Sequence, residues 1–319
     1  MSKWKSYALV LCFLLSFLLA LTGCSAQAVN QAADHLQTAV LNQTSSIGHS
    51  DNDYGKTQAK GNVTIDMLDI GQGDAILIRV GDEYSLIDTG DVVHRENIVA
   101  QLKQEGVRSL KRIIITHPHA DHMGGFYAIA KAIPVERVYD NGIDANNGMF
   151  TTYLKWIDKK NIQRISVKRG DTIDFGNGAS FAVLAPFEDD KSDASKLKDL
   201  NNYSIVGKFS FGKFSMLFAG DAEGPEENRL IKEDNSKLFA RVLKVGHHGS
   251  NHSTSKKWIR SIKPESALIS VGVNNDYGHP GGETLKRLEA EDVAIYRTDK
   301  QGRIRIQTDG KTWNISTER

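Results

Sequence analysis

The sequence predicts an α/β fold in which two β-sheets pack together and helices lie outside them. Three observations support this prediction. Runs of β-type residues begin at Val63 and recur to the end of the 319-residue chain. The first three runs form a β-meander, and later runs alternate with helical stretches, as expected of packed sheets with outer helices. Hydrophobic residues make up 40% of the chain and charged residues 25%, the profile of an ordinary globular protein.

The first half of the pattern opens with the β runs "VTIDMLDI", "DAILIRV" and "EYSLIDTG", which Gly-containing turns separate. Three helices are expected next, at residues 96–105, 124–133 and 147–161. Strands are expected between and after these helices, at residues 112–116, 136–140, 164–167, 180–186, 203–212 and 213–221. Several of these strands end in polar residues, which matters for the site predicted below.

The second half continues the alternation. Helices are expected at residues 225–232, 254–261 and 283–290. Strands are expected at residues 240–250, 265–272, 293–298, 302–308 and 311–315. No internal repeat and no low-complexity segment is evident in the sequence. We therefore predict one domain over residues 62–319.

The N-terminus has the pattern of an export signal. Lys3 and Lys5 precede the apolar stretch "YALVLCFLLSFLLALTGC". Its last four residues resemble a bacterial lipobox, which implies a signal peptide over residues 1–23 and an acylated Cys24. We therefore expect a secreted lipoprotein, anchored by lipid to the extracytoplasmic face of the cell membrane. An uncleaved membrane anchor helix is the alternative.

Residues 24–61 are small and polar and contain too few large apolar side chains to bury a core, so we expect a tether. The two cysteines, Cys12 and Cys24, lie outside the predicted domain. That domain therefore has no thiol for a disulfide or for a metal site. A net charge of +1 gives no general attraction to nucleic acid or membranes, so local features must hold an anionic substrate. The sequence indicates no protein partner.

A cluster of metal-ligating residue types follows the expected strand at residues 112–116. Within "THPHADHMGG" lie His117, His119, Asp121 and His122. Imidazole and carboxylate groups suit Zn, Fe or Mn, and capping alone does not explain four such residues in six positions. His117 and His119 could share one ion while Asp121 and His122 reach a second.

Further candidates follow other expected strands. Asp221 follows "FSMLFAG", the pair His247 and His248 follows "RVLKVG", and Asp88 follows "YSLI". His279 lies in the loop "NNDYGHP". Asp221 alone could be a helix cap, but its coincidence with the histidine pairs favours a ligand that bridges two cations. Asp88 is expected to orient a ligand histidine.

The motifs together resemble a known family. The His-x-His-x-Asp-His loop, the "GD" strand end and the later histidines resemble the metallo-β-lactamase superfamily, which implies a four-layer αββα fold. The segments "DIGQGDAILI", "LIDTG", "FAGDAE", "LKVGHHGS" and "NNDYGHP" resemble the C-terminal nuclease-like domain of ComEC-type competence proteins. The resemblance runs from about residue 65 to residue 308 and implies a freestanding lipoprotein version of that domain. It also places Gln72 and Asp74 near the metal loop.

The resemblance implies one or two divalent ions, Zn or Mn, in unequal sites. The superfamily usually has another histidine before the bridging aspartate, but Asn201 or Asn202 falls there in this chain. We expect a tight site from Asp121, His122, Asp221 and a late histidine, and a weaker one from His117, His119 and Asp221. The position of the ligand in related proteins favours His248 over His247, which would then contact substrate or support a ligand.

The expected activity is that of an exported hydrolase, most simply a phosphodiesterase or DNase acting through a metal-activated hydroxide. Asp121 could orient the hydroxide, and His279 could protonate the leaving oxygen or stabilise an anionic one. Phosphate could also bind at the helix start in "GSNHSTSKKWIR", next to Lys256, Lys257 and Arg260. The alternatives are a phosphocholine esterase, a lactonase or a β-lactamase-like hydrolase of the cell envelope, or a non-enzymatic protein. The expected partners are DNA or another phosphodiester, and the membrane through Cys24.

Overall fold

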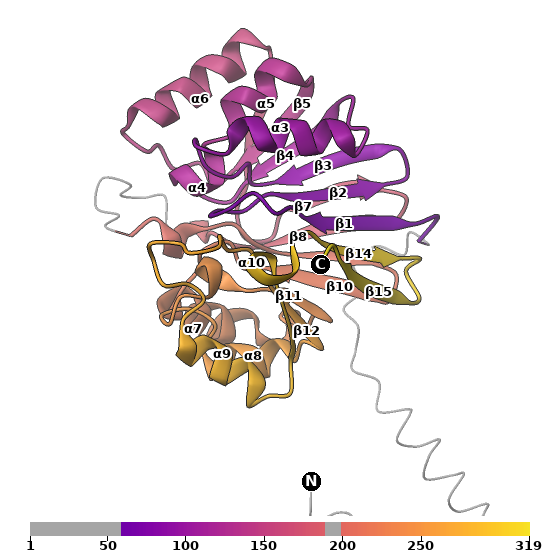
Figure 1. The fold of residues 1–319 in the computed structure, drawn as a ribbon, viewed down its shortest axis with the longest axis vertical. Helices are drawn as coiled ribbons and strands as arrows, with labels where there is room; N and C mark the ends of the chain where they lie inside the picture. The colour runs from indigo at the N-terminus through magenta and orange to yellow at the C-terminus, as the bar shows by residue number, and fades with distance from the viewer. Residues whose placement is uncertain (1–58, 189–198) are drawn as a thin grey trace, which may run out of the picture. The chain divides into compact units, whose positions relative to one another are not determined.

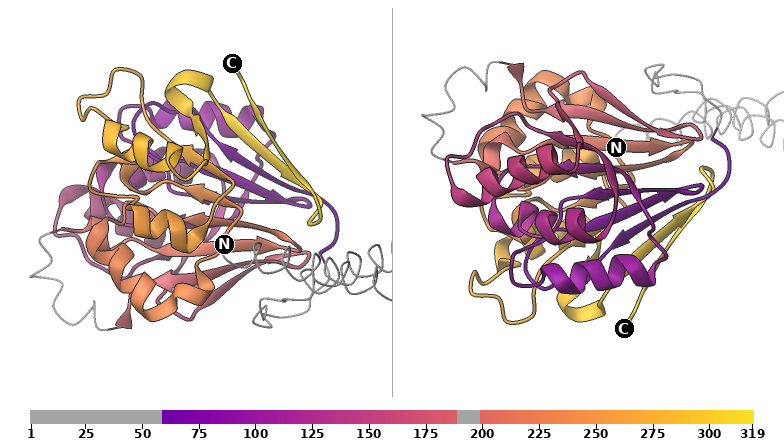
Figure 2. Two further views of the ribbon diagram at one scale, coloured as in Figure 1. Left: turned by 90° about the horizontal axis from the view of Figure 1, so that it is seen from below. Right: turned by 90° about the horizontal axis from the view of Figure 1, so that it is seen from above.

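Two β-sheets pack face to face, and helices cover the outer face of each (Figure 1). The structure is a computed structural model that describes residues 59–188 and 199–319. Seen from below and from above, the orange helices of the second half lie on one side and the purple helices of the first half on the other (Figure 2). The predicted α/β fold with four αββα layers is therefore confirmed.

The first sheet has strand order β15-β14-β1-β2-β3-β4-β5-β6. Its strands are β1 Val63–Met67, β2 Ile76–Val80, β3 Glu83–Ile87, β4 Leu110–Ile115, β5 Val135–Asp140, β6 Gln163–Ser166, β14 Ile304–Thr308 and β15 Trp313–Thr317. Strands β15 to β3 pair antiparallel, whereas β3 to β6 pair parallel. The last two strands of the chain, β14 and β15, extend this sheet beyond β1. β14 pairs with β1 in the register Ile306 to Ile65.

Three long helices connect the strands of the first sheet and cover its outer face. They are α3 Arg95–Gln104, α5 Phe126–Ala132 and α6 Gly148–Lys159. Each has an apolar side that packs on the strands, for example Ile98 of α3, Ile129 of α5 and Tyr153 of α6 in one buried cluster. Helices that join parallel strands in this way leave the carboxyl ends of the strands at one edge.

The second sheet has strand order β13-β12-β11-β10-β9-β8-β7. Its strands are β7 Thr172–Gly176, β8 Ala179–Ala185, β9 Val206–Phe211, β10 Phe214–Phe218, β11 Val242–Lys244, β12 Ser266–Ile269 and β13 Ala294–Arg297. Strands β7 to β10 pair antiparallel and β10 to β13 pair parallel. The helices α7 Gly224–Asp234, α8 Lys256–Ile262 and α9 Gly282–Glu289 cover the outer face, where Trp258 is fully buried.

The core between the sheets is apolar and rich in aromatic rings. Phe175, Phe181 and Phe209 of the second sheet are at most 1% exposed and lie in one cluster with Ile65 and Ile306 of the first. Phe175 and Phe209 meet edge to face, with ring centroids 5.4 Å apart. This packing fixes the two sheets against each other and so fixes the loops that both sheets present at their common edge.

The structure differs from the sequence prediction in some short elements. β7 was not predicted because only Ile173 and Phe175 of its sequence "TIDFG" are apolar, and they are buried while Thr172 and Asp174 are exposed. The loop after β4 contains a short helix, α4 Ala120–Met123, and α10 Thr298–Gln301 follows β13 directly. Short 3-10 helices also occur, as η2 Asn201–Tyr203, η3 Asn235–Lys237 and η4 Gly246–Gly249.

The expected signal peptide, the acylated Cys24 and nearly all of the expected tether lie outside the described residues. All described residues belong to one unit of contacts. Within residues 59–188 and 199–319, no helix has both the length and the hydropathy needed to cross a bilayer.

Candidate metal centre

The predicted site residues follow four strands that end at one edge of the two sheets. β3 and β4 run parallel in the first sheet, and β10 and β11 run parallel in the second. Asp88 follows β3, residues 117–122 follow β4, Asp221 follows β10, and the pair His247–His248 follows β11. Loops from both sheets therefore contribute to one cluster, in keeping with the tendency of α/β sheets to place sites at the carboxyl ends of their strands.

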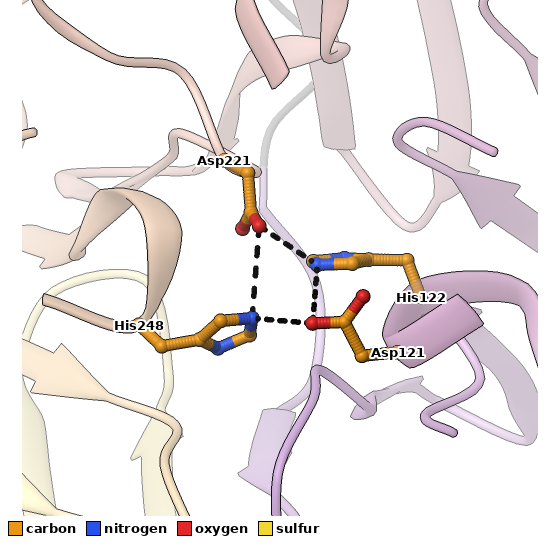
Figure 3. A group of neighbouring side chains, drawn as sticks. All are labelled: Asp121, His122, Asp221 and His248. Carbon is orange, nitrogen blue, oxygen red and sulfur yellow. Dashed lines mark hydrogen bonds and ion pairs between the residues drawn. The ribbon is translucent and has the colours of Figure 1, made fainter. Parts of the chain in front are cut away.

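Four of these residues form the centre of the cluster. Asp121, His122, Asp221 and His248 each offer one donor atom, and all four atoms lie within 4.8 Å of one another. The side chains point toward a common centre (Figure 3). His122 Nε2 lies 3.2 Å from Asp221 Oδ2, and His248 Nε2 lies 3.2 Å from Asp121 Oδ2. The structure thus places His248, and not His247, in this set of four.

Hydrogen bonds within this set leave two of its polar atoms unsatisfied. His122 Nε2 and Asp221 Oδ1 are buried, yet neither has a hydrogen-bond partner among the described residues. A buried polar atom without a partner costs free energy, so such atoms need an explanation. Two imidazole nitrogens and two carboxylates suit Zn, Mn or Fe. The residues therefore fit one divalent ion.

The charges of the cluster shift the pKa values of its members. Burial lowers the pKa of His122, but the carboxylates of Asp221, Asp88 and Asp121 outweigh burial and raise it well above 6.5. The same balance, with Asp221 and Asp74 as the acids, raises the pKa of His248 to about 10. Burial raises the pKa of Asp221, but the imidazolium charges of His122 and His248 outweigh it and lower that pKa well below 3.8. The set therefore has an excess of negative charge, which a cation would neutralise in place of these protons.

Asp88 orients His122, as the sequence suggested. Asp88 Oδ2 accepts a hydrogen bond from His122 Nδ1 at 2.8 Å and one from Thr116 Oγ1 at 2.8 Å. Its Oδ1 accepts from the Thr116 backbone N–H at 2.7 Å, and Asp88 is fully buried. These bonds place the proton of His122 on Nδ1 and leave Nε2 free for the common centre.

His248 has a different support, which the sequence did not reveal. His248 Nδ1 donates to the Ser270 carbonyl at 2.9 Å, and Asp74 Oδ1 lies 3.5 Å from the same nitrogen. Asp74 in turn forms an ion pair with Lys244, whose Nζ lies 2.7 Å from Asp74 Oδ2. The motif "GQGDA" and the lysine that ends β11 thus form a charged layer behind His248.

The segment "GHHG" that carries His247 and His248 has an unusual backbone. His247 has φ 45 and ψ 51, and His248 has φ 50 and ψ 24, so two successive non-glycine residues are left-handed. Such conformations are costly for L-residues and concentrate at functional sites. The turn points the two rings in different directions, so that their Nδ1 atoms have different partners. Nε2 of each ring nevertheless lies within 4 Å of Asp221 Oδ2.

The predicted second site is less complete. His117 Nε2 lies 3.9 Å from Asp221 Oδ2 and 3.0 Å from His119 Nδ1. Burial and the charge of His122 lower the pKa of His117 well below 6.5, so its ring is neutral. His247 Nε2 approaches the same oxygen, at 3.9 Å, while its Nδ1 contacts Glu223 Oε1 at 2.7 Å. His247 therefore lies beside this second group of donors, a place that the sequence did not predict for it.

Of the two asparagines considered, Asn201 faces the site. Its Oδ1 is buried without a hydrogen-bond partner in the described part of the chain, and its Nδ2 lies 3.4 Å from His247 Nδ1. Asn202 is turned away, because its amide binds Asp199 and the Glu223 backbone. Asn201 thus adds an amide oxygen where the superfamily usually has imidazole.

A pocket of about 300 Å³ opens onto the cluster. Its lining residues are Gln72, His119, Ala120, Asp121, Asn201, Asp221, His247, His248, Tyr277 and His279. None of these is Lys or Arg, so the side-chain hydrogen-bond donors of this lining are imidazoles, amides and the Tyr277 hydroxyl. Burial and the charges of His247 and His248 lower the pKa of His279 to about 4, so its ring is neutral at pH 7. Tyr277 was not predicted as a site residue.

The predicted phosphate site at the start of α8 is wrong. The Ser255 side chain caps the helix by accepting from the Trp258 N–H at 3.2 Å. The carboxylate of Glu227 binds the backbone N–H groups of Thr254 and Ser255, so these donors are already occupied. Two of the expected cations are also engaged, since Lys256 and Arg260 both pair with Glu291. The sequence could not show this because Glu227 comes from α7.

Comparison with known proteins agrees with this architecture. The family model of the metallo-beta-lactamase superfamily matches residues 68–273. ComE operon protein 3 of Bacillus subtilis (strain 168) is 31% identical over 270 residues, which cover 79% of this chain and 34% of that protein. Competence protein ComA of Neisseria gonorrhoeae is 31% identical over 243 residues, 76% of this chain and 32% of the relative. Recombination protein 2 of Haemophilus influenzae is 30% identical over 253 residues, 76% and 28% of the two chains.

The chain spans about a third of the length of these curated relatives. Two solved structures share its fold. One is the metallo-β-lactamase fold protein YhfI from Bacillus subtilis, with a TM-score of 0.52 and 9% identity over 80% of this chain and 100% of that one. The other is CmlA, a diiron β-hydroxylase from Streptomyces venezuelae, with a TM-score of 0.53 and 16% identity over 78% of this chain and 54% of that one. At these identities the likeness shows the fold alone.

Proposed function

Because the chain belongs to the metallo-β-lactamase superfamily, we propose that this hydrolase is a metal-dependent phosphodiesterase that cleaves DNA. The observation that carries the proposal is the set of four donors from Asp121, His122, Asp221 and His248 at the floor of an open pocket. The curated relatives add support for the substrate, since their names refer to competence and recombination. Both words point to DNA.

The residues of the pocket divide into those that hold the ion and those that face the substrate. A divalent ion held by the set of four would lower the pKa of a water molecule and offset negative charge on the attacked phosphate. Asp121 is 28% exposed at its side chain, the most open of the set, and would orient that water. His247 and His279 also line the pocket, with ring centroids 5.3 Å apart. The neutral ring of His279 can donate an N–H to a phosphate or leaving-group oxygen.

The charge of the pocket favours a substrate with one negative charge per group. No Lys or Arg is among the lining residues, so the N–H donors that the described chain offers there come from histidine and amide side chains. A phosphodiester carries one negative charge, which an ion and these donors can balance. This argument applies less well to a neutral lactone or lactam, although both remain test substrates.

We further propose that the protein acts outside the cytoplasm on a lipid anchor at Cys24. The support is the sequence of residues 1–24 alone, with its basic start, apolar stretch and "LTGC" end. Metabolic labelling with a fatty acid tests it. The wild-type chain should take up label and fractionate with membranes, whereas Cys24→Ser should not be labelled; label on the variant would overturn the anchor.

The activity is tested with the full chain purified in detergent. The protein is incubated with Mn²⁺ or Zn²⁺ and offered single-stranded DNA, duplex DNA, a phosphocholine ester, a lactone and a β-lactam. We expect metal-dependent cleavage of DNA that Asp221→Ala abolishes. Intact DNA under both metals, together with turnover of another substrate, would instead assign a different hydrolase of the cell envelope.

A further inference from the structure

An exposed tyrosine stands at the rim of the catalytic pocket. Tyr277 is 69% exposed, although it also lines the pocket together with His279. A single exposed aromatic side chain is ordinary by itself, but this one borders the catalytic pocket. Among the described residues, Phe239 is the other large aromatic side chain that is exposed, and it is exposed less than Tyr277. A ligand that approaches the pocket from solvent can therefore contact the ring of Tyr277.

Within the described part of the chain, the ring of Tyr277 has one ring contact, which is with His279. Its plane makes an angle of 9° with the ring of His279, and the two centroids are 5.8 Å apart. His279 in turn lies beside His247, with 5.3 Å between centroids. Tyr277 is 69% exposed, so the contact with His279 leaves most of its side chain open to solvent. A flat ligand on the ring face away from His279 would continue the stack outward from the metal centre.

The loop that carries Tyr277 is held in place by its own side chains. Asn275 Nδ2 donates to the carbonyls of Gly272 at 3.0 Å and His279 at 2.7 Å. Asn275 Oδ1 accepts from the backbone N–H of Tyr277 at 3.2 Å and of His279 at 3.0 Å. Gln72 fixes the start of the loop by accepting from the Gly272 N–H at 3.3 Å. A preordered loop loses little entropy when it binds a ligand.

We propose that Tyr277, backed by His279, is a stacking platform for an unpaired nucleobase next to the scissile phosphate. The proposal rests on the proposed function and names its substrate as single-stranded DNA. Aromatic side chains hold single strands in this way because every base has a flat face, and the base must be free of a duplex partner to reach the ring. The pocket lacks Lys and Arg, so stacking would supply affinity that a basic groove supplies elsewhere.

The test compares two single-stranded oligonucleotides of equal length, an oligo-dT and one whose residues are all abasic. With the full chain and Mn²⁺, the wild type should cleave oligo-dT with a kcat/KM roughly 5- to 150-fold higher, the range that one base stacked on an aromatic ring contributes. Tyr277→Ala should remove this preference, mainly through a higher KM for oligo-dT. Tyr277→Phe should keep the preference and Tyr277→Leu should lose it, because only Phe is planar.

Val273→Ala is the matched control, since Val273 is 63% exposed on the same loop but does not line the pocket. It should behave as the wild type. A wild type that cleaves both strands equally, or Tyr277→Ala that keeps the preference, would overturn the platform and leave the nuclease standing.

Binding of the two strands to metal-free protein, followed by fluorescence anisotropy, separates the two proposals. The platform requires tighter binding of oligo-dT than of the abasic strand, and loss of this difference in Tyr277→Ala. If neither strand is cleaved, the nuclease proposal fails. Equal binding of both strands would overturn the platform whatever the cleavage result.

Discussion

Lys244 Nζ lies 2.7 Å from Asp74 Oδ2, and each side chain is only 1% exposed. Burial raises the pKa of Asp74, but the charges of Lys244 and His248 outweigh burial and lower it below 3.8. Removing one partner of a fully buried ion pair is costly, because the remaining charge is then neither paired nor solvated. This pair lies directly behind a residue of the metal centre, so its stability and the position of His248 depend on each other.

Lys244→Met should therefore destabilise the protein by about 3–5 kcal/mol, measured by urea unfolding in the presence of a chelator. The double variant Lys244→Met with Asp74→Asn should lose less than Lys244→Met alone, because no buried charge is left. Lys286→Met is the control: its pair with Glu283 is 72% and 61% exposed, so the change should stay below about 1 kcal/mol. Additive losses in the double variant would contradict this account.

Asp88→Asn should weaken metal binding about 10- to 100-fold, because Asp88 fixes the ring of His122 without contacting the centre itself. Competition with a chromophoric chelator measures the affinity. Asp140→Asn is a matched control, since Asp140 is also a buried carboxylate at the end of a strand in the same sheet but binds Tyr153 and Arg164 instead. It should reduce stability and leave metal affinity unchanged. Equal loss of affinity in both variants would show a general effect of destabilisation.

The two groups of donors should bind ions unequally. The wild type dialysed against metal-free buffer should retain about one ion per chain, and a second ion should bind only at higher concentration. His248→Ala removes a donor from the set of four and should weaken the tight site by more than about 100-fold, beyond the range for the loss of a supporting residue. His119→Ala should leave the tight site intact. Calorimetric titration that finds two sites of one affinity would refute the asymmetry.

Asp234 provides a test of acid stability away from the metal centre. Its side chain is 3% exposed and accepts from Arg169 Nε at 2.5 Å and pairs with Lys237 Nζ at 2.9 Å. Burial raises the pKa of Asp234, but the bonds from Arg169 and Lys237 outweigh it and lower that pKa below 3.8. A lowered folded-state pKa means that the stabilisation is complete above the unfolded value and is lost as the pH falls through the folded value.

Asp234→Asn should thus cost roughly 1–3 kcal/mol at pH 7, the range for hydrogen bonds to charged groups. The difference from the wild type should shrink as the pH falls below about 4. Urea unfolding of both proteins between pH 7 and pH 3 measures this difference. A difference that is independent of pH would exclude the carboxylate charge as its source.

The order of strands and helices was largely predictable because each element carries a local pattern. β7 was the exception, since a strand at the edge of a sheet needs only two buried side chains, Ile173 and Phe175, to hold it. Local patterns also showed that Asp221 and the two late histidines follow strands. Convergence of these strand ends at one edge is a property of parallel pairing, so the general position of the site followed.

The finer assignment of roles could not be predicted because it depends on contacts between distant segments. His247 and His248 are neighbours in sequence, and only the left-handed backbone of "GHHG" sends one to the set of four and the other toward Glu223. Lys244 looks like an ordinary strand residue until Asp74 is placed beside it. The basic residues near α8 suggested phosphate binding, but the backbone N–H groups at the start of that helix already donate to the carboxylate of Glu227 from α7.

The set of four takes Asp121 and His122 from a loop of the first sheet, and Asp221 and His248 from loops of the second. A bound ion would therefore cross-link the two halves of the molecule, and its removal would break that link. Because the ion binds the folded state, resistance to unfolding and proteolysis should rise with the concentration of free metal. The free energy of unfolding should increase by about 2.7 kcal/mol when the free ion exceeds its dissociation constant a hundredfold. When the ion is scarce, the protein would lose its activity and would also be degraded faster.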